Sequence, residues 1–171
     1  MELRDGELVL RPWTEADVPA VVAACNDPEI PRWIPVIPRP YTTEDGLAFV
    51  RGEIDPRPEH SFAITQAGTV VGSIGITTNQ RGTGHIGYWC APEARGRGLT
   101  TRALRVLCRW GFDGLGLARL ELITDPDNLA SQRVAEKVGY RREGVLRSHL
   151  PHRDGRRRDS VMFSLLPGEL Q

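Results

Sequence analysis

Residues 92–104 read PEARGRGLTTRAL and place two glycines and two arginines directly before a helical pattern. A helix N-terminus carries unpaired N–H groups and a partial positive charge, and glycines before it let a ligand approach the backbone. Arg95 and Arg97 add charge-assisted donors that suit phosphate. The segment therefore predicts an anion site built around Gly96 and Gly98, with an ordinary strand-to-helix turn as the alternative.

Two familiar phosphate-binding loops do not match this segment. The Walker A loop ends in Gly-Lys-Ser or Gly-Lys-Thr, which is not found here, and the dinucleotide fingerprint needs a third glycine where Thr101 stands. The dinucleotide loop also follows the first strand of a βαβ unit, whereas the preceding strand here is the third of an antiparallel meander. A nucleotide-phosphate module is therefore the last-ranked alternative.

Apolar periodicity divides the rest of the chain into strands and helices. We expect strands at residues 7–13, 60–65, 69–77, 85–90, 117–124, 140–150 and 160–166. We expect helices from about residue 14 to 25, from 42 or 43 to before Pro56, from 98 to 111 or 114, and at 128–138. The five prolines of residues 27–40 predict a loop or broken turns, and residues 151–158 predict a turn. This order is typical of an α+β domain around one largely antiparallel sheet.

Length and composition limit the class of protein. A chain of 171 residues with 40% hydrophobic content fits one domain, residues 1–171. The formal net charge of zero does not favour a nucleic-acid partner, and no apolar run is long enough to span a bilayer or form a signal peptide. Three widely spaced cysteines argue against a disulfide framework and a zinc site. We therefore expect a cytoplasmic protein without a metal or a membrane partner.

Four stretches together resemble one family, the GNAT superfamily of N-acetyltransferases, and within it the RimJ/RimL-like branch that includes ribosomal-protein N-terminal acetyltransferases. They are LVLRPWTEAD at residues 8–17, GYWCAPEARGRGLTTRAL at 87–104, NLASQRVAEKVGYRREGVLR at 128–147 and GRRRDSVMFSLL at 155–166. The resemblance covers nearly the whole chain. It implies a mixed, mostly antiparallel seven-stranded sheet flanked by about four helices.

The resemblance also implies an activity, which is acyl transfer from acetyl-CoA to a primary amine by direct transfer in a ternary complex. A non-catalytic acyl-CoA-binding sensor is the alternative. In the family, a loop of the form Q/R-x-x-G-x-G/A holds the coenzyme A pyrophosphate with its backbone amides, and this chain departs from the pattern at Thr100. The cofactor-binding residues implied by the resemblance are Tyr88, Trp89, Cys90, Arg95, Gly96, Arg97, Gly98, Leu99, Thr100 and Asn128.

Two residues are the candidates for proton transfer. Ser131 matches a family serine that assists the thiolate leaving group, and a solvated position in the first helical turn is its structural alternative. Many relatives carry a glutamate two positions before Gly-Tyr-Trp, where this chain has His85, and some carry a carboxylate where it has residues 148–150. Histidine can accept a proton near neutral pH. Cys90 raises a further alternative, a route through an acyl-cysteine.

The acceptor is the least constrained part of the prediction. Arg32 and Trp33 lie in the proline-rich loop 27–40, which together with the turn at 151–158 is expected to shape acceptor specificity, since binding residues concentrate on loops. A protein N-terminus and a small-molecule amine are both compatible with the family. The arginines at 156–158 form a solvated turn or steer an acidic substrate. Relatives imply a monomer or a homodimer.

Overall fold

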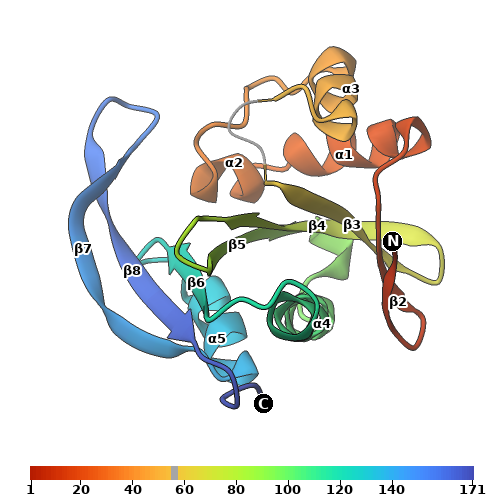
Figure 1. Cartoon of the computed structure of the whole chain (residues 1–171). Coiled ribbons are helices and arrows are strands. Elements are labelled where there is room, and N and C mark those ends of the chain that lie inside the picture. The colour runs from red at the N-terminus through yellow and green to blue at the C-terminus, as the bar shows by residue number, and fades with distance from the viewer. Residues whose placement is uncertain (55–57) are drawn as a thin grey trace.

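The computed structural model describes residues 1–54 and 58–171, and the eight strands in them form one mixed sheet in the order β1-β2-β3-β4-β5-β6-β8-β7 (Figure 1). The strands are β1 (Leu3–Asp5), β2 (Leu8–Arg11), β3 (His60–Gln66), β4 (Thr69–Thr78), β5 (Thr83–Cys90), β6 (Arg119–Thr124), β7 (Arg141–Pro151) and β8 (Arg157–Leu165). The helices are α1 (Val18–Cys25), α2 (Glu29–Trp33), α3 (Thr43–Arg51), α4 (Leu99–Asp113) and α5 (Leu129–Val138). The predicted α+β class with a mostly antiparallel mixed sheet is confirmed.

One detail of the prediction was wrong. The sheet has eight strands because a short strand, β1, precedes the first predicted one and turns back on it at Gly6, whose φ is +58°. The segment 27–40, predicted as a loop or broken turns, contains the five-residue helix α2. Pro31 is compatible with α2 because it lies in the first turn, where a backbone N–H has no intrahelical acceptor. The helix α3 ends at Arg51, before Pro56 as expected, and residue 56 itself lies outside the described residues.

Helices cover both faces of the sheet (Figure 1). Helices α1, α2 and α3 lie over one face, and α4 and α5 lie over the other. The helix α4 packs closely on the sheet. A Cβ atom added at Gly111 of this helix would lie only 3.2 Å from a methyl group of Leu120 in β6. Among the described residues no helix is long and apolar enough to cross a membrane.

The two central strands separate partway along their length. The parallel ladder between β5 and β6 runs from Thr83↔Arg119 to Ile86↔Leu122 and includes no later pair. The other side of β5 stays paired with β4 throughout, including Gly75↔Gly87, without a register shift. The sheet therefore opens beside Gly87 on the β6 side, while the β4–β5 ladder runs through Gly87 without a bulge. Residues 87–90 keep a free backbone edge toward β6.

Asp17 fixes the entry into α1. Its carboxylate accepts two hydrogen bonds from Arg11, at 2.8 and 2.7 Å, and two more from the amide and hydroxyl of Thr14, at 2.9 and 3.0 Å. Asp17 is 6% exposed. The Arg11 guanidinium is the main reason why the pKa of Asp17 lies below its ordinary value of 3.8, and burial acts against it. Arg11 ends β2, so this pair joins the sheet to the first helix.

We expect Asp17→Asn to lower the free energy of unfolding by about 2 kcal/mol at pH 7, because hydrogen bonds between charged groups contribute about 1.5–3 kcal/mol. The measurement is urea denaturation. Since the folded-state pKa is lowered, this contribution is complete above pH 3.8 and is lost as the pH falls further. The difference in the free energy of unfolding between wild type and Asp17→Asn should therefore become smaller in acid. Exposed Asp113→Asn is the control, and an equal loss there would contradict the assignment.

Candidate functional site

Two adjoining cavities open where β5 separates from β6. The first has a volume of about 420 Å³ and extends toward the loop before α4. The second has a volume of about 740 Å³ and extends beneath α2 and α3. Tyr88, Trp89, Asn128 and Ser131 line both cavities, as does Trp33 from the end of α2. A molecule in one cavity can therefore meet a molecule in the other at these side chains.

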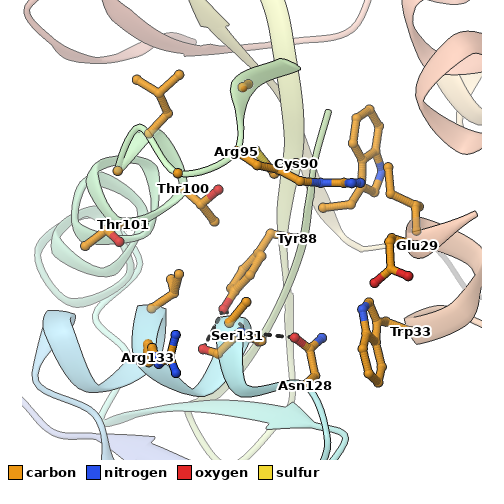
Figure 2. A pocket seen from close by; sticks show the side chains of 18 of the residues that line it. Glu29, Trp33, Tyr88, Cys90, Arg95, Thr100, Thr101, Asn128, Ser131 and Arg133 are labelled. Carbon is orange, nitrogen blue, oxygen red and sulfur yellow. Dashed lines mark hydrogen bonds between the residues drawn. The ribbon is translucent and has the colours of Figure 1, made fainter. Parts of the chain in front are cut away.

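The loop predicted to hold an anion lines the first cavity (Figure 2). Gly96 and Gly98 both have a φ of +73°, a conformation that glycine adopts without strain. A Cβ atom at either position would meet no atom within 4 Å, so the backbone is open to a ligand. The helix α4 then begins, and its first intrahelical bond runs from Arg102 N to Gly98 O. The amides of residues 99–101 precede that bond and have no acceptor among the described residues.

Thr100, the position that departs from the family pattern, is compatible with this geometry. It is the second residue of α4, so its backbone is helical. A β-branched side chain does not block an amide at a helix start, because the N–H points along the helix axis.

Basic residues add to the first cavity. Arg95 lies 2.6 Å from the carboxylate of Asp27. Arg133 and Lys137 also line this cavity, one turn apart on α5, and the sequence analysis missed both. Their i, i+4 spacing on the helix predicted at residues 128–138 was the available signal. A phosphate-rich ligand suits this cavity, because it offers the backbone amides of residues 99–101, the exposed Arg133 and Lys137, and the partly exposed Arg95. The free edge of β5 suits a chain of amides.

The side chains at the junction form a connected group (Figure 2). The Asn128 side chain accepts a hydrogen bond from Ser131 N at 3.1 Å and so caps α5. The Ser131 hydroxyl lies 2.9 Å from the Tyr88 hydroxyl. Burial raises the pKa of Tyr88 well above its ordinary value, so the phenol stays protonated. This group can hold and pass a proton where the cavities meet.

Cys90 lines the first cavity, near Thr100 (Figure 2). Burial raises the pKa of the Cys90 thiol, and a hydrogen bond with Thr100 only partly opposes this. A thiol with a raised pKa is a poor nucleophile at neutral pH because the thiolate is the reactive form. The geometry therefore does not favour an acyl-cysteine route.

Apolar side chains form most of the wall of the second cavity. They come from the segment between α2 and α3, from α3 itself and from the sheet, and include Ile34, Ile37, Phe49, Trp89 and Leu150. The floor contains Gly75 and Gly87, which are register partners. A Cβ atom at Gly87 would have no neighbour within 4 Å, so any side chain there would project into open space.

Three predicted site residues do not line either cavity. Arg97 is exposed and does not line the first cavity. Arg32 pairs with Glu29 at 3.3 Å and stacks over Trp33, with its guanidinium carbon 4.5 Å from the ring centre. His85 shares a strand face with Gly87 but lies beyond the cavity. A role for Arg32 would therefore act through Trp33, and the roles of Arg97 and His85 stay predictions.

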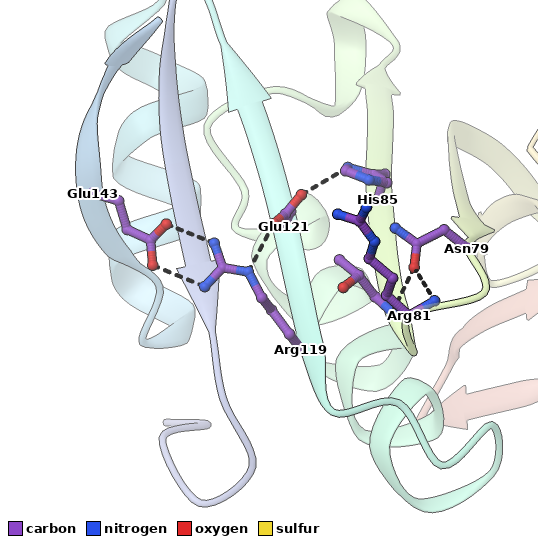
Figure 3. Close-up of polar contacts among 7 residues, drawn as sticks. Asn79, Arg81, His85, Arg119, Glu121 and Glu143 are labelled. Atoms are coloured by element: carbon purple, nitrogen blue, oxygen red, sulfur yellow. Dashed lines mark hydrogen bonds and ion pairs between the residues drawn. The ribbon is translucent and has the colours of Figure 1, made fainter.

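His85 belongs to a polar group of side chains from β5, β6 and β7 (Figure 3). Its Nδ1 lies 3.1 Å from a carboxylate oxygen of Glu121, and the other oxygen of Glu121 accepts from Arg119 at 2.7 Å. Arg119 also binds Glu143 through two hydrogen bonds of 2.8 and 2.6 Å. Arg119 is the main reason why the pKa of Glu143 is lowered to about 2. The Glu121 contact orients the imidazole, and His85 is 46% exposed and open to water.

Comparison with known proteins agrees with the geometry. The model of the acetyltransferase (GNAT) domain matches residues 7–141. The chain is 26% identical to the uncharacterized N-acetyltransferase p20 of Bacillus licheniformis over an alignment of 175 positions, which covers 99% of this chain and 91% of that protein. It also resembles the crystal structure of a GNAT-family acetyltransferase from Bacillus anthracis, with a TM-score of 0.87, 26% identity and coverage of 97% and 98%.

A third similar structure is Mycobacterium smegmatis RimJ in complex with CoA-disulfide. Its TM-score is 0.82 and its identity is 26%, over 99% of this chain and 87% of that one. The family match covers most of the chain, and these relatives match it along nearly its whole length. The chain therefore belongs to the GNAT acetyltransferase family and is an acetyl-CoA-dependent N-acetyltransferase.

Proposed function

We propose that the first cavity holds acetyl-CoA, that the second holds the amine acceptor, and that the acetyl group passes directly between them in a ternary complex. The observation that carries this proposal is the meeting of the two cavities at Tyr88, Trp89, Asn128 and Ser131. No observation favours the alternative of a sensor without turnover. A second cavity of about 740 Å³ at the reactive end is more than a sensor needs.

The first cavity supplies the donors that coenzyme A requires. The amides of residues 99–101 and the backbone of Gly96 and Gly98 would hold the pyrophosphate, as in the family pattern. Arg133 and Lys137 add positive charge for phosphate, and Arg95 can exchange its contact with Asp27 for a phosphate oxygen. The free edge of β5 at residues 87–90 offers hydrogen bonds to the pantetheine amides.

The cofactor supplies an acetyl group on sulfur: the C–N bond forms as the C–S bond breaks, the amine gives up a proton and the sulfur gains one. Ser131 and Tyr88 are the residues proposed to deliver the proton that the sulfur gains. The Tyr88 phenol stays protonated and lies 2.9 Å from the Ser131 hydroxyl and 3.3 Å from the Ser131 carbonyl oxygen. In the proposed arrangement it donates to the hydroxyl oxygen, which leaves the serine O–H free to point toward the junction. Ser131 is therefore the proposed acid and Tyr88 its positioning residue.

We assign the first proton to His85, acting through water. Glu121 accepts from Nδ1 in this arrangement, which leaves Nε2 as the acceptor nitrogen. Water can connect Nε2 to the acceptor amine across Gly87, where no side chain stands. The base need not be strong, because an α-amino group has a reference pKa of about 7.7–8.0.

The test of the function is thiol release from acetyl-CoA with a panel of amines, run beside calorimetric titration of coenzyme A. Binding without release for any amine would support a sensor. No binding at millimolar concentration would contradict the assignment of the first cavity.

Replacing Ser131 by alanine should lower kcat about 100-fold, because it removes the proton donor, the usual effect of losing general acid catalysis being 10²–10⁴-fold. The affinity for coenzyme A should change less than about threefold, since Asn128 and the loop amides remain. Tyr88→Phe is the matched variant and should lower kcat by a smaller factor. An unchanged kcat in Ser131→Ala would show that the sulfur takes its proton from elsewhere.

His85→Ala should lower kcat about 100-fold at pH 7 through loss of the base, with less effect as the pH rises and the amine deprotonates without help. Glu121→Gln keeps the imidazole but removes the carboxylate that orients it, so a smaller loss is expected. The measurement is the pH profile of kcat/KM. If His85→Ala follows the wild-type profile, another group accepts the proton, and Asp125, a carboxylate that lines the second cavity, is then the next candidate to test.

Gly87→Leu should fill part of the second cavity and leave the fold intact, because an added side chain at this position meets open space. We expect kcat/KM for the acceptor to fall about 10-fold or more, while the calorimetric affinity for coenzyme A stays within about threefold. Gly87→Ala, which adds one methyl group, is the graded control. A fall in coenzyme A affinity equal to the fall in acceptor efficiency would contradict the division of the site into two cavities.

A further inference from the structure

We infer that the acceptor carries a carboxylate beside its amine and that Arg158 recognises this carboxylate, so that the substrates are compact amino acids with apolar side chains. The inference rests on the proposed acceptor role of the second cavity. It goes beyond that role because it names the chemical class that the cavity selects.

Arg158 is placed inside the second cavity by strand pairing. It lies near the start of β8, opposite Leu150 of β7, and both residues line the cavity. Its side chain is 16% exposed. Asp125, directly after β6, lies on the same sheet face and is also 16% exposed. The sequence analysis gave residues 156–158 as a solvated turn or as a group that steers an acidic substrate, and the turn is wrong for Arg158 because β8 already begins at Arg157.

The guanidinium of Arg158 has more donors than partners. Its Nη1 donates to Asp125 at 3.2 Å, while its Nε is buried and has no hydrogen-bond partner among the described residues. A buried donor without an acceptor costs about 1–3 kcal/mol. Asp125 is also shared, since its other oxygen accepts from Asp127 N at 2.9 Å. A carboxylate in the cavity would accept from Nη2, which has no partner among the described residues and, unlike Nε, is not buried. A turn of the guanidinium would bring Nε into a second, parallel hydrogen bond with the same carboxylate.

The charges of the second cavity leave Arg158 as the anchor for an anion. It is the only cationic side chain among the described residues that line this cavity. Asp45 also lines it, but its carboxylate accepts from the amide and hydroxyl of Thr42 at 2.7 Å each, at the start of α3. The remaining walls are mostly apolar, and a carboxylate enters such surroundings only when it is paired.

The chain around Arg158 is also basic. From Arg147 to Arg158, with both included, the sequence has five arginines and one aspartate, a formal charge of +4. Arg153 in the β7–β8 turn donates to the carbonyl oxygen of Ile37, so this basic turn contacts the segment that forms the cavity wall. A basic turn beside an apolar cavity raises the local concentration of small anionic molecules.

The position of the pair limits the size of the acceptor. Asp125 lies three residues before Asn128, which lines the junction of the two cavities. The amine must reach the junction while the carboxylate reaches the Asp125–Arg158 pair. An α-amino acid places these two groups on one carbon atom and leaves its side chain for the apolar wall. A protein N-terminus has an amide carbonyl in place of the carboxylate and is a weaker match for a guanidinium.

The experiment compares acceptors that differ only in the carboxylate. Leucine, methionine and phenylalanine are each paired with the corresponding carboxamide, and kcat/KM is measured with acetyl-CoA in wild type, Arg158→Met and Arg158→Lys. We expect Arg158→Met to lower kcat/KM for the amino acids 10-fold or more, and for the amides less than threefold. Arg158→Lys should retain part of the preference. Comparing each acceptor between enzymes cancels the different basicities of the amines.

Arg141→Met is the control for loss of charge, because Arg141 is 76% exposed and pairs with Glu169 outside the cavity. It should keep the wild-type preference. Equal losses for acids and amides in Arg158→Met, or a tripeptide amide preferred over the free amino acids, would overturn the inference and leave the acetyltransferase function standing.

A binding measurement covers the case of slow turnover. The coenzyme A complex of the wild type should bind N-acetylleucine at least 10-fold more tightly than N-acetylleucinamide by calorimetry, and Arg158→Met should remove the difference. Equal affinities in the wild type would overturn the inference. Failure of coenzyme A itself to bind would instead contradict the proposed function, so the two failures are distinguishable.

Discussion

The rest of the structure depends on the early end of one parallel ladder. Pairing between β5 and β6 stops at Ile86↔Leu122, although β5 continues to Cys90 and β6 to Thr124. Backbone N–H and C=O groups that lose a strand partner need another acceptor or donor. The sheet therefore contains an edge in its interior that a ligand with its own amides can complete. Closing this gap would satisfy the backbone and remove both cavities.

Packing on the two faces of β5 keeps the gap open. On one face Tyr88 reaches Ser131 at the start of α5, and on the other Trp89 packs against Trp13, with ring centres 6.3 Å apart. Successive side chains of a strand point to opposite faces. One short segment thus contributes a proton-holding phenol to the first cavity and an apolar wall to the second. Gly87 directly precedes these two aromatic residues on β5, and because it has no side chain it leaves room for the acceptor.

Features set by neighbours in sequence were predictable, and features set by strand pairing were not. The Gly96–Gly98 loop and the Asn128 cap depend on residues within one turn, and both lie as expected. Arg95 lines the first cavity and Arg97 does not, a difference that residue type alone does not determine. Arg158 meets Asp125, 33 residues away, only because β8 pairs with β6. The residues that discriminate acceptors belong to this second kind.

The zero net charge of the chain conceals two different cationic sites. Arg133 and Lys137 are exposed beside a row of backbone amides, so hydrated, multiply charged phosphates can reach them without losing all their water. Arg158 is held between apolar walls and already shares one carboxylate, so a second anion reaches it only after desolvation. Desolvation costs more for a dianionic phosphate than for a single carboxylate. The same charge therefore selects phosphate in one cavity and a carboxylate with an apolar body in the other.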